Sequence, residues 1–112
     1  YNFRTDFAIY RQKYNFLQPE EIRAARQEMG LSQAEAAVVL GLDANLLADI
    51  EANMALQPYD QELKLRWLLS PATLSSLVRN HQEIMAERCR QAEVDAEGLL
   101  EKLAHYEQMT DI

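Results

Sequence analysis

Two glycines divide residues 19–53 into three short helical segments, and this division constrains the fold more than any other feature of the sequence. Gly30 and Gly41 each follow an amphipathic stretch, where glycine accepts the left-handed conformation that ends a helix. Ser32, with Glu35 three residues later, predicts a capping box at the start of the second segment. Asp43 predicts an N-cap for the third segment. The chain is therefore expected to turn tightly at 30–31 and 41–42.

The apolar residues of these segments recur at helical spacing, which places them on one face of each helix. Alternating β-branched runs do not occur, so the sequence predicts an all-α protein. Small residues, Ala36 and Ala37, stand where the second helix must approach the third closely, and this arrangement is a helix-turn-helix. A fourth helix over 58–69 is expected to close the core. The predicted core positions are Ile22, Ala25, Met29, Leu46, Leu47, Ile50, Leu63, Trp67 and Leu68.

A stripe of aromatic side chains marks the N-terminal segment. Phe3, Phe7, Tyr10 and Tyr14 follow one another at spacings of four, three and four, which predicts one face of a helix. We expect this face to pack on the next domain or on a second copy of the chain. Stacking of these rings on nucleic acid bases is the less favoured alternative, because stacking platforms usually lie on exposed sheets or in grooves.

Charge is distributed unevenly along a chain whose net charge is −7. Residues 1–17 hold three basic residues against one acidic residue, a net charge of +2, whereas residues 18–70 carry −5 and residues 71–112 carry −4. Affinity for nucleic acid rests mainly on the neutralisation of phosphates. Any contact with DNA should therefore depend on the first segment.

The C-terminal segment predicts a short helix and then a long one, with a break near Asn80. A heptad seam runs along the long helix, because its apolar and small residues alternate spacings of four and three. Such a narrow stripe either folds back on the globular part or pairs with a second chain, and we favour pairing. The predicted dimerisation residues are Met85, Cys89, Ala92, Ala96, Leu99, Leu103 and Tyr106.

Several kinds of chemistry find no support in the sequence. A single cysteine excludes an internal disulfide framework and fits a reducing, cytoplasmic compartment. His81, His105 and Cys89 lack the spacing of metal ligands, and no catalytic triad or glycine-rich phosphate loop is present. We therefore expect neither an enzyme nor a bound metal or other cofactor. No apolar run approaches the roughly 20 residues that span a membrane, and the start at Tyr1 suggests that the chain is part of a longer protein.

Residues 19–69 resemble the Xre/Cro-type helix-turn-helix family through "EIRAARQEMGLSQAEAAVVLGLDANLLADIEANM". The wider stretch "YRQKYNFLQPEEIRAARQEMGLSQAEAAVVLG" is similar to the C-terminal domain of MqsA-like antitoxin regulators, which often carry an N-terminal zinc ribbon. The resemblance implies a lambda-repressor-like bundle over 18–70, to which we add an aromatic helix over 1–17 and a long helical extension over 71–112. It implies a transcriptional regulator that binds double-stranded operator DNA as a homodimer, with a toxin as a candidate protein partner.

The resemblance also implies roles for individual residues. An arginine on the first family helix and a glutamate at the end of the recognition helix form an ion pair, and here these are Arg26 and Glu51. Gln33 matches the glutamine that contacts DNA at the start of the second helix. The first turn of the recognition helix reads base edges, and an amide there can bond to adenine. The implied DNA-binding residues are therefore Gln33, Ala44, Asn45 and Leu46, together with the cation of Arg23.

Three departures from the family pattern support an alternative function. Asp49 stands where the family usually has Arg, Lys or Ser beside a phosphate, and an acid there repels DNA. The following loop, "NMALQPYD", contains no basic residue. Leu46 and Leu47 are both apolar, so one of them is expected to face outward, towards a thymine methyl group or a protein. The alternative is a degenerate helix-turn-helix that serves as a protein-interaction or dimerisation module.

Overall fold

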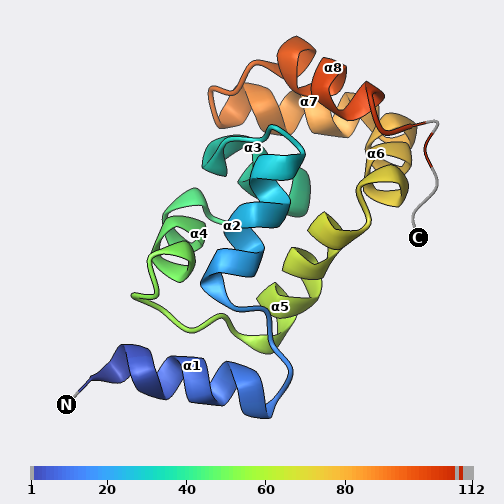
Figure 1. Ribbon diagram of the computed structural model, residues 1–112. Helices are drawn as coiled ribbons and strands as arrows, with labels where there is room; N and C mark the ends of the chain where they lie inside the picture. The colour runs from blue at the N-terminus through green and yellow to red at the C-terminus, as the bar shows by residue number, and fades with distance from the viewer. Residues whose placement is uncertain (1, 108, 110–112) are drawn as a thin grey trace.

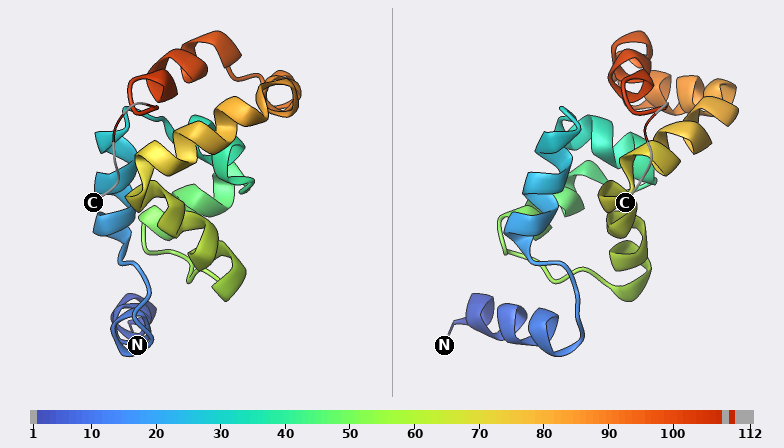
Figure 2. Two further views of the ribbon diagram at one scale, coloured as in Figure 1. Left: turned by 90° about the vertical axis from the view of Figure 1, so that its right-hand side faces the viewer. Right: turned by 45° about the vertical axis from the view of Figure 1, so that its right-hand side comes forward.

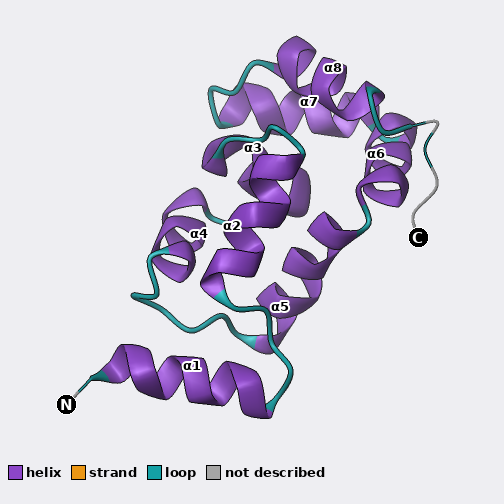
Figure 3. Ribbon diagram, viewed as in Figure 1, coloured by secondary structure: helices purple, strands orange, loops and turns teal. Residues whose placement is uncertain are grey.

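Helices are the only regular elements in the described part of the chain, so the predicted all-α class is confirmed (Figure 3). The computed structural model describes residues 2–107 and 109. The elements in chain order are α1 (Phe3–Lys13), α2 (Pro19–Glu28), α3 (Gln33–Leu40), α4 (Ala44–Glu51), α5 (Tyr59–Leu65), the 3₁₀ helix η1 (Arg66–Leu69), α6 (Pro71–Asn80), α7 (Gln82–Gln91) and α8 (Ala96–Ala104). No helix among them is long and apolar enough to cross a membrane.

The predicted helix boundaries in the centre of the chain are confirmed by their caps. Gly30 and Gly41 have φ angles of 71° and 74°, the left-handed conformation expected after α2 and α3. Ser32 Oγ accepts a hydrogen bond from the Glu35 N–H at 3.1 Å, and Glu35 Oε1 accepts one from the Ser32 N–H at 2.9 Å. Asp43 Oδ2 accepts from the Leu46 N–H at 3.2 Å. These local bonds satisfy N–H groups that would otherwise lack partners, so each helix begins where its cap lies.

The core of the bundle contains most of the predicted apolar positions. Ile22, Leu47 and Ile50 are fully buried, and Met29 is 3% exposed. Leu46 is only partly buried, at the edge of the core. These side chains hold α2 and α4 together beside α3, whose residues 36–40 are all buried (Figure 1).

The predicted inner face of the fourth helix is confirmed at Leu68 and wrong at Leu63 and Trp67. Leu63 and Trp67 are 50% and 42% exposed, whereas Leu65 and Leu68 are buried. Two causes shift the face. Residues 66–69 form a 3₁₀ helix, which rotates the side chains that follow, and the carboxylate of Glu62 lies inside, where it accepts hydrogen bonds from the Leu17 N–H at 3.1 and 3.2 Å.

Helix α1 lies across one end of the bundle, remote from the C-terminal helices in all views (Figures 1 and 2). The predicted aromatic stripe is not the side that docks. Tyr10 and Tyr14 are 41% and 52% exposed, and Phe3 and Phe7 are half-buried against each other at a centroid distance of 5.5 Å. The buried residue of α1 is Arg11, whose polar contacts hold the helix in place.

The expected long C-terminal helix is wrong, because the chain turns back between α7 and α8. Glu93 has φ of 57°, a left-handed residue in the turn after α7. In the left view of Figure 2, α7 is seen end-on and α8 runs across the page, so the two helices cross, and they contact each other. Lys102 on α8 bonds Glu35 on α3 at 2.7 Å, and Tyr106 Oη donates to the Glu28 carbonyl at 2.7 Å. The extension is therefore part of the bundle.

The heptad seam is buried within its own chain. Met85, Cys89, Leu99 and Leu103 are all at most 5% exposed and belong to the same core as the helix-turn-helix. Of the remaining seam residues, Ala92 is exposed, while Ala96 and Tyr106 are partly buried. The seam is buried by the packing of α7 and α8 on each other and on the bundle, so the fold-back alternative describes this chain. A homodimer stays a prediction, and its contacts cannot be made by these four buried side chains.

Candidate nucleic acid interface

The turn between α3 and α4 sets the exposed end of α4. Gly41 takes the left-handed conformation, and the Leu42 N–H donates to the Ala37 carbonyl at 2.8 Å. Ala36 and Ala37 are 0% and 3% exposed, so the two helices approach closely without a bulky side chain between them. This geometry directs the first turn of α4, capped by Asp43, away from the core.

Glu51 anchors the opposite end of α4 through an ion pair. Its side chain is 2% exposed and receives two hydrogen bonds of 2.8 Å from Arg26, one to each carboxylate oxygen. Arg26 also donates to the Leu31 carbonyl at 2.8 Å. The hydrogen bond to Glu51 raises the pKa of the Arg26 guanidinium despite its burial. Such a two-pronged arrangement fixes both the distance and the angle between α2 and α4.

Two residues implied to bind DNA also converge on Glu51. Arg23 Nη2 donates to the Glu51 carbonyl at 2.6 Å, and its side chain remains 44% exposed. Gln33 Nε2 donates to Glu51 Oε1 at 3.2 Å and is partly buried. The cation and the amide therefore lie at the carboxyl end of α4, whereas Asn45 is the second residue of the helix and lies in its first turn. One N–H of the Gln33 amide is used in this bond, so its other N–H and its carbonyl oxygen are left to meet a ligand.

The exposed face of α4 is short and mildly acidic. Asn45 and Asp49, four residues apart, are exposed on it, and neither side chain makes a hydrogen bond within the described residues. Ala44, Ala48 and Leu46 are partly buried beside them. Of the two adjacent leucines, Leu46 is therefore the one that reaches towards the surface, and Leu47 is fully buried.

Arg11 joins α1 to the loop that follows α4, a role that the sequence did not indicate. Its side chain is fully buried and donates to Gln57 Oε1 at 2.9 Å, Asn53 Oδ1 at 2.6 Å and the Ala55 carbonyl at 2.8 Å. Burial lowers the pKa of the Arg11 guanidinium, and the nearby carboxylates of Glu20 and Glu62 partly offset that effect. Arg11 is consequently unavailable to phosphate, contrary to the expectation for the basic N-terminal segment.

Arg4, in contrast, brings an exposed cation to the same loop. Its Nη2 lies 2.8 Å from the Met54 sulfur, and its carbonyl accepts a hydrogen bond of 3.3 Å from Asn53 Nδ2. The loop, which contains no basic residue of its own, therefore has one placed beside it by α1. Local sequence gives no sign of this, because the contact joins residues 49 and 50 positions apart.

Two exposed cations lie near α4 on one side. Arg23 contacts the carboxyl end of α4 and Arg4 lies beside the loop after it, whereas α4 itself contains no basic residue. The face is neither uniformly negative nor clearly positive. A DNA backbone would meet its cations from α2 and α1, not from the recognition helix.

Residues 22–58 match the family model described as helix-turn-helix. The match begins within α2 and ends in the loop before α5, so it covers both helices of the motif and the Arg26–Glu51 pair. This segment is a helix-turn-helix. Neither the comparison with curated proteins nor the comparison with solved structures found a match.

A metal-binding cluster and a reactive thiol are two further kinds of site that the residue types allow. Within 2–107 and 109, no group of three or more His, Cys, Asp or Glu side chains is arranged to hold a metal ion. Cys89 is fully buried, and that burial, with the carboxylates of Asp95 and Glu35, raises the pKa of its thiol.

Proposed function

We propose that this chain is a DNA-binding transcriptional regulator of the Xre type, with α4 entering the major groove. The observation that supports this most directly is the locked α3–turn–α4 unit, whose recognition helix exposes Asn45 in its first turn while Glu51 fixes its other end. A rigid helix held in this way is the element that helix-turn-helix proteins place against base edges.

Each implied contact has a distinct role in the proposed complex. Asn45 offers a free amide, which can donate to and accept from an adenine edge. Ala44 and Leu46 flank it and would contact thymine methyl groups. Gln33 and Arg23 would meet the backbone beside the carboxyl end of α4. We add Arg4, because it supplies the phosphate-side charge that the loop after α4 lacks.

The alternative function is a protein-interaction module built on the same motif. The observation that favours it is Asp49, an exposed acid on the very face that would enter the groove. Phosphate repulsion at one position reduces affinity without abolishing it, because binding is the sum of several phosphate contacts. We therefore place DNA binding first.

We further propose that the regulator acts as a homodimer in the cytoplasm and that it belongs to the antitoxin-type regulators. A dimer would present two copies of α4 to successive major grooves, about 34 Å apart. With the C-terminal seam buried, the exposed Ile9, Tyr10 and Tyr14 of α1 are the apolar surface best suited to pair two copies. A toxin as protein partner rests on the resemblance alone, and co-purification with the product of the adjacent gene would test it.

Fluorescence polarisation with labelled duplexes tests the proposal. The probes are duplexes tiled across the region upstream of the coding sequence, with a scrambled duplex of equal composition for comparison. We expect one tiled duplex to bind more tightly than the scrambled one, and Asn45→Ala to remove that preference. The matched control is Asn80→Ala, an exposed amide at the end of α6. No binding to any duplex at low salt would refute DNA binding by this chain.

A further inference from the structure

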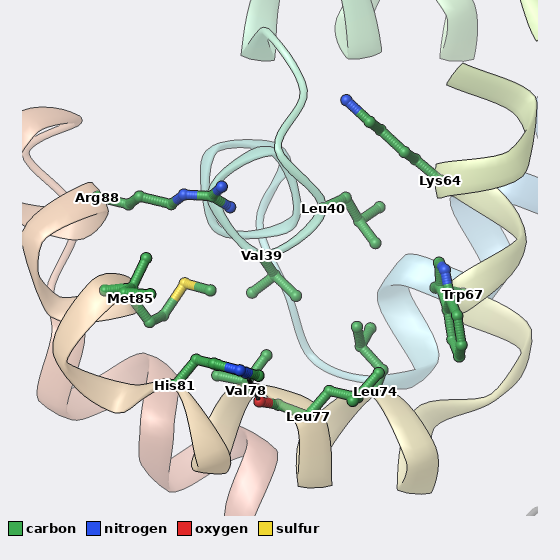
Figure 4. A pocket seen from close by; sticks show the side chains of 11 residues that line it. Val39, Leu40, Lys64, Trp67, Leu74, Leu77, Val78, His81, Met85 and Arg88 are labelled. Atoms are coloured by element: carbon green, nitrogen blue, oxygen red, sulfur yellow. Dashed lines mark hydrogen bonds between the residues drawn. The ribbon is translucent and has the colours of Figure 1, made fainter. Parts of the chain in front are cut away.

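An apolar groove with a volume of about 390 Å³ opens on the side of the bundle that carries α5, η1, α6 and α7. Val39 and Leu40 of α3 lie at its centre, with Val78 and Met85 beside them (Figure 4). No residue of α4 lines it, so the groove is separate from the proposed DNA interface.

The walls of the groove leave large apolar side chains in contact with solvent. Trp67, Leu77 and Ile84 line it and are 42%, 41% and 58% exposed. They come from η1, α6 and α7, which converge around the end of α3. Contiguous exposed apolar surface of this kind usually marks a binding site, whereas isolated exposed apolar residues do not.

The charges of the groove have one sign. Its lining includes Lys64 and Arg88 but no acidic residue, although the chain as a whole carries a net charge of −7. Both cations reach the same place, the end of α3: Lys64 Nζ lies 3.1 Å from the Gly41 carbonyl, and Arg88 Nη1 lies 3.6 Å from the position of a Cβ on Gly41. Within the described residues neither cation forms a salt bridge, so both can pair with an incoming carboxylate.

We propose that this groove binds an acidic amphipathic helix of a partner protein. The apolar side of that helix would cover Trp67, Leu77 and Ile84, and carboxylates at its edge would meet Lys64 and Arg88. Amphipathic helices dock in grooves of this kind through residues spaced three and four apart. A second copy that docks groove to groove fits less well, because a twofold axis would bring the two pairs of cations together.

Trp67 reports binding directly, since it is the single tryptophan of the chain. The probe is a synthetic amphipathic helical peptide with leucines on one face and glutamates along both edges, and its counterpart has every glutamate replaced by lysine. We expect the acidic peptide to shift Trp67 emission to shorter wavelength in a saturable titration and the basic peptide to leave it unchanged. Affinity should fall as salt is raised, since part of it is electrostatic.

Two groove variants and two matched controls locate the binding. Leu77→Glu and Arg88→Glu should each weaken the acidic peptide by about tenfold or more, which corresponds to at least ~1.4 kcal/mol. The controls Met109→Glu and Lys13→Glu introduce an acid at an exposed apolar position and at an exposed cation outside the groove, and they should bind as the parent chain does. All four substitutions lie at exposed side chains, and unchanged far-ultraviolet circular dichroism confirms that each variant is folded.

Three results would overturn the proposal. The first is no response of Trp67 to the acidic peptide, and the second is equal binding of the acidic and basic peptides. The third is a dimer in sedimentation that Leu77→Glu dissociates, which would assign the groove to a second copy. Binding of Leu77→Glu to DNA is measured in parallel, and we expect it to be unchanged, so failure of the groove proposal is distinguishable from failure of DNA binding.

Discussion

Replacement of Arg11 by methionine should release α1 from the bundle without unfolding the rest. The guanidinium makes three hydrogen bonds to the loop after α4, and its buried acceptor on Gln57 lies in a side chain only 1% exposed. Without Arg11 that acceptor has lost its donor, which costs about 1–3 kcal/mol. The acceptors on Asn53 and Ala55 are partly exposed and can bond to water instead.

The expected net loss of α1 docking free energy is about 2–4 kcal/mol. The charge-assisted bonds contribute about 1.5–3 kcal/mol each. Removal of the buried cation also removes the free-energy cost of desolvating it, and this offsets part of the lost hydrogen bonding. An undocked α1 of 11 residues is only marginally helical in water. Its amides should then exchange roughly 30- to 700-fold faster, since each 1.4 kcal/mol is a factor of ten.

Amide hydrogen exchange, read by mass spectrometry on peptides from α1 and from α2, is the assay. Lys13→Met is the matched control, because it removes one exposed cation from the same helix. We expect Arg11→Met to accelerate exchange in α1 and to leave α2 near its parent rate. Unchanged exchange in α1 would show that Arg11 does not hold the helix. Equal acceleration in α1 and α2 would show that α1 is integral to the core.

Three further predictions follow from the pairs and buried groups of the bundle. Glu51→Ala should lower the free energy of unfolding in urea by about 3–5 kcal/mol, because Arg26 stays buried without its counter-charge. The double variant that also carries Arg26→Met should recover part of that free energy. Losses that simply add in the double variant would contradict the pairing. Burial raises the pKa of Glu35, but its bonds to Lys102 and Ser32 lower it more, so the pKa falls below its ordinary value near 4.5. The ionised Glu35 therefore stabilises the fold above that pH, and this stabilisation is lost as the pH falls through the pKa of the folded state. Lys102→Met should flatten the decline of the urea midpoint on the acid side. The buried thiol of Cys89 should react with Ellman's reagent only as fast as the bundle opens, and rapid reaction without denaturant would contradict its place in the core.

The parts of the fold that sequence predicted well are those determined by local chemistry. Ser32, Asp43 and the glycines after α2 and α3 act on backbone groups within a few residues of themselves, so their pattern is visible in the chain. The ion pair between Arg26 and Glu51 joins residues 25 positions apart and came only from the family resemblance.

The parts that were missed depend on contacts between distant segments. Glu93 adopts a left-handed conformation without being glycine, so nothing in the sequence marked the turn that divides the heptad seam between two separate helices. Apolar spacing is the same for a seam that meets a second chain and for one that meets its own. In the sequence, Arg11 looks like an exposed cation beside aromatic rings. Its hydrogen bond acceptors lie 42–46 residues away along the chain, so no local pattern indicates that it is buried.

The central claim, that α4 enters the major groove, is tested most directly by Asp49→Arg. The Asp49 side chain is exposed on the groove-facing side and makes no hydrogen bond among the described residues, so its replacement leaves the bundle intact. Glu83→Arg, which makes the same charge change at an exposed position on α7, is the control. We measure the salt dependence of DNA affinity by polarisation. The account predicts tighter binding and a salt slope steeper by about one for Asp49→Arg than for Glu83→Arg. Equal affinities and slopes for the two variants at low salt would contradict it.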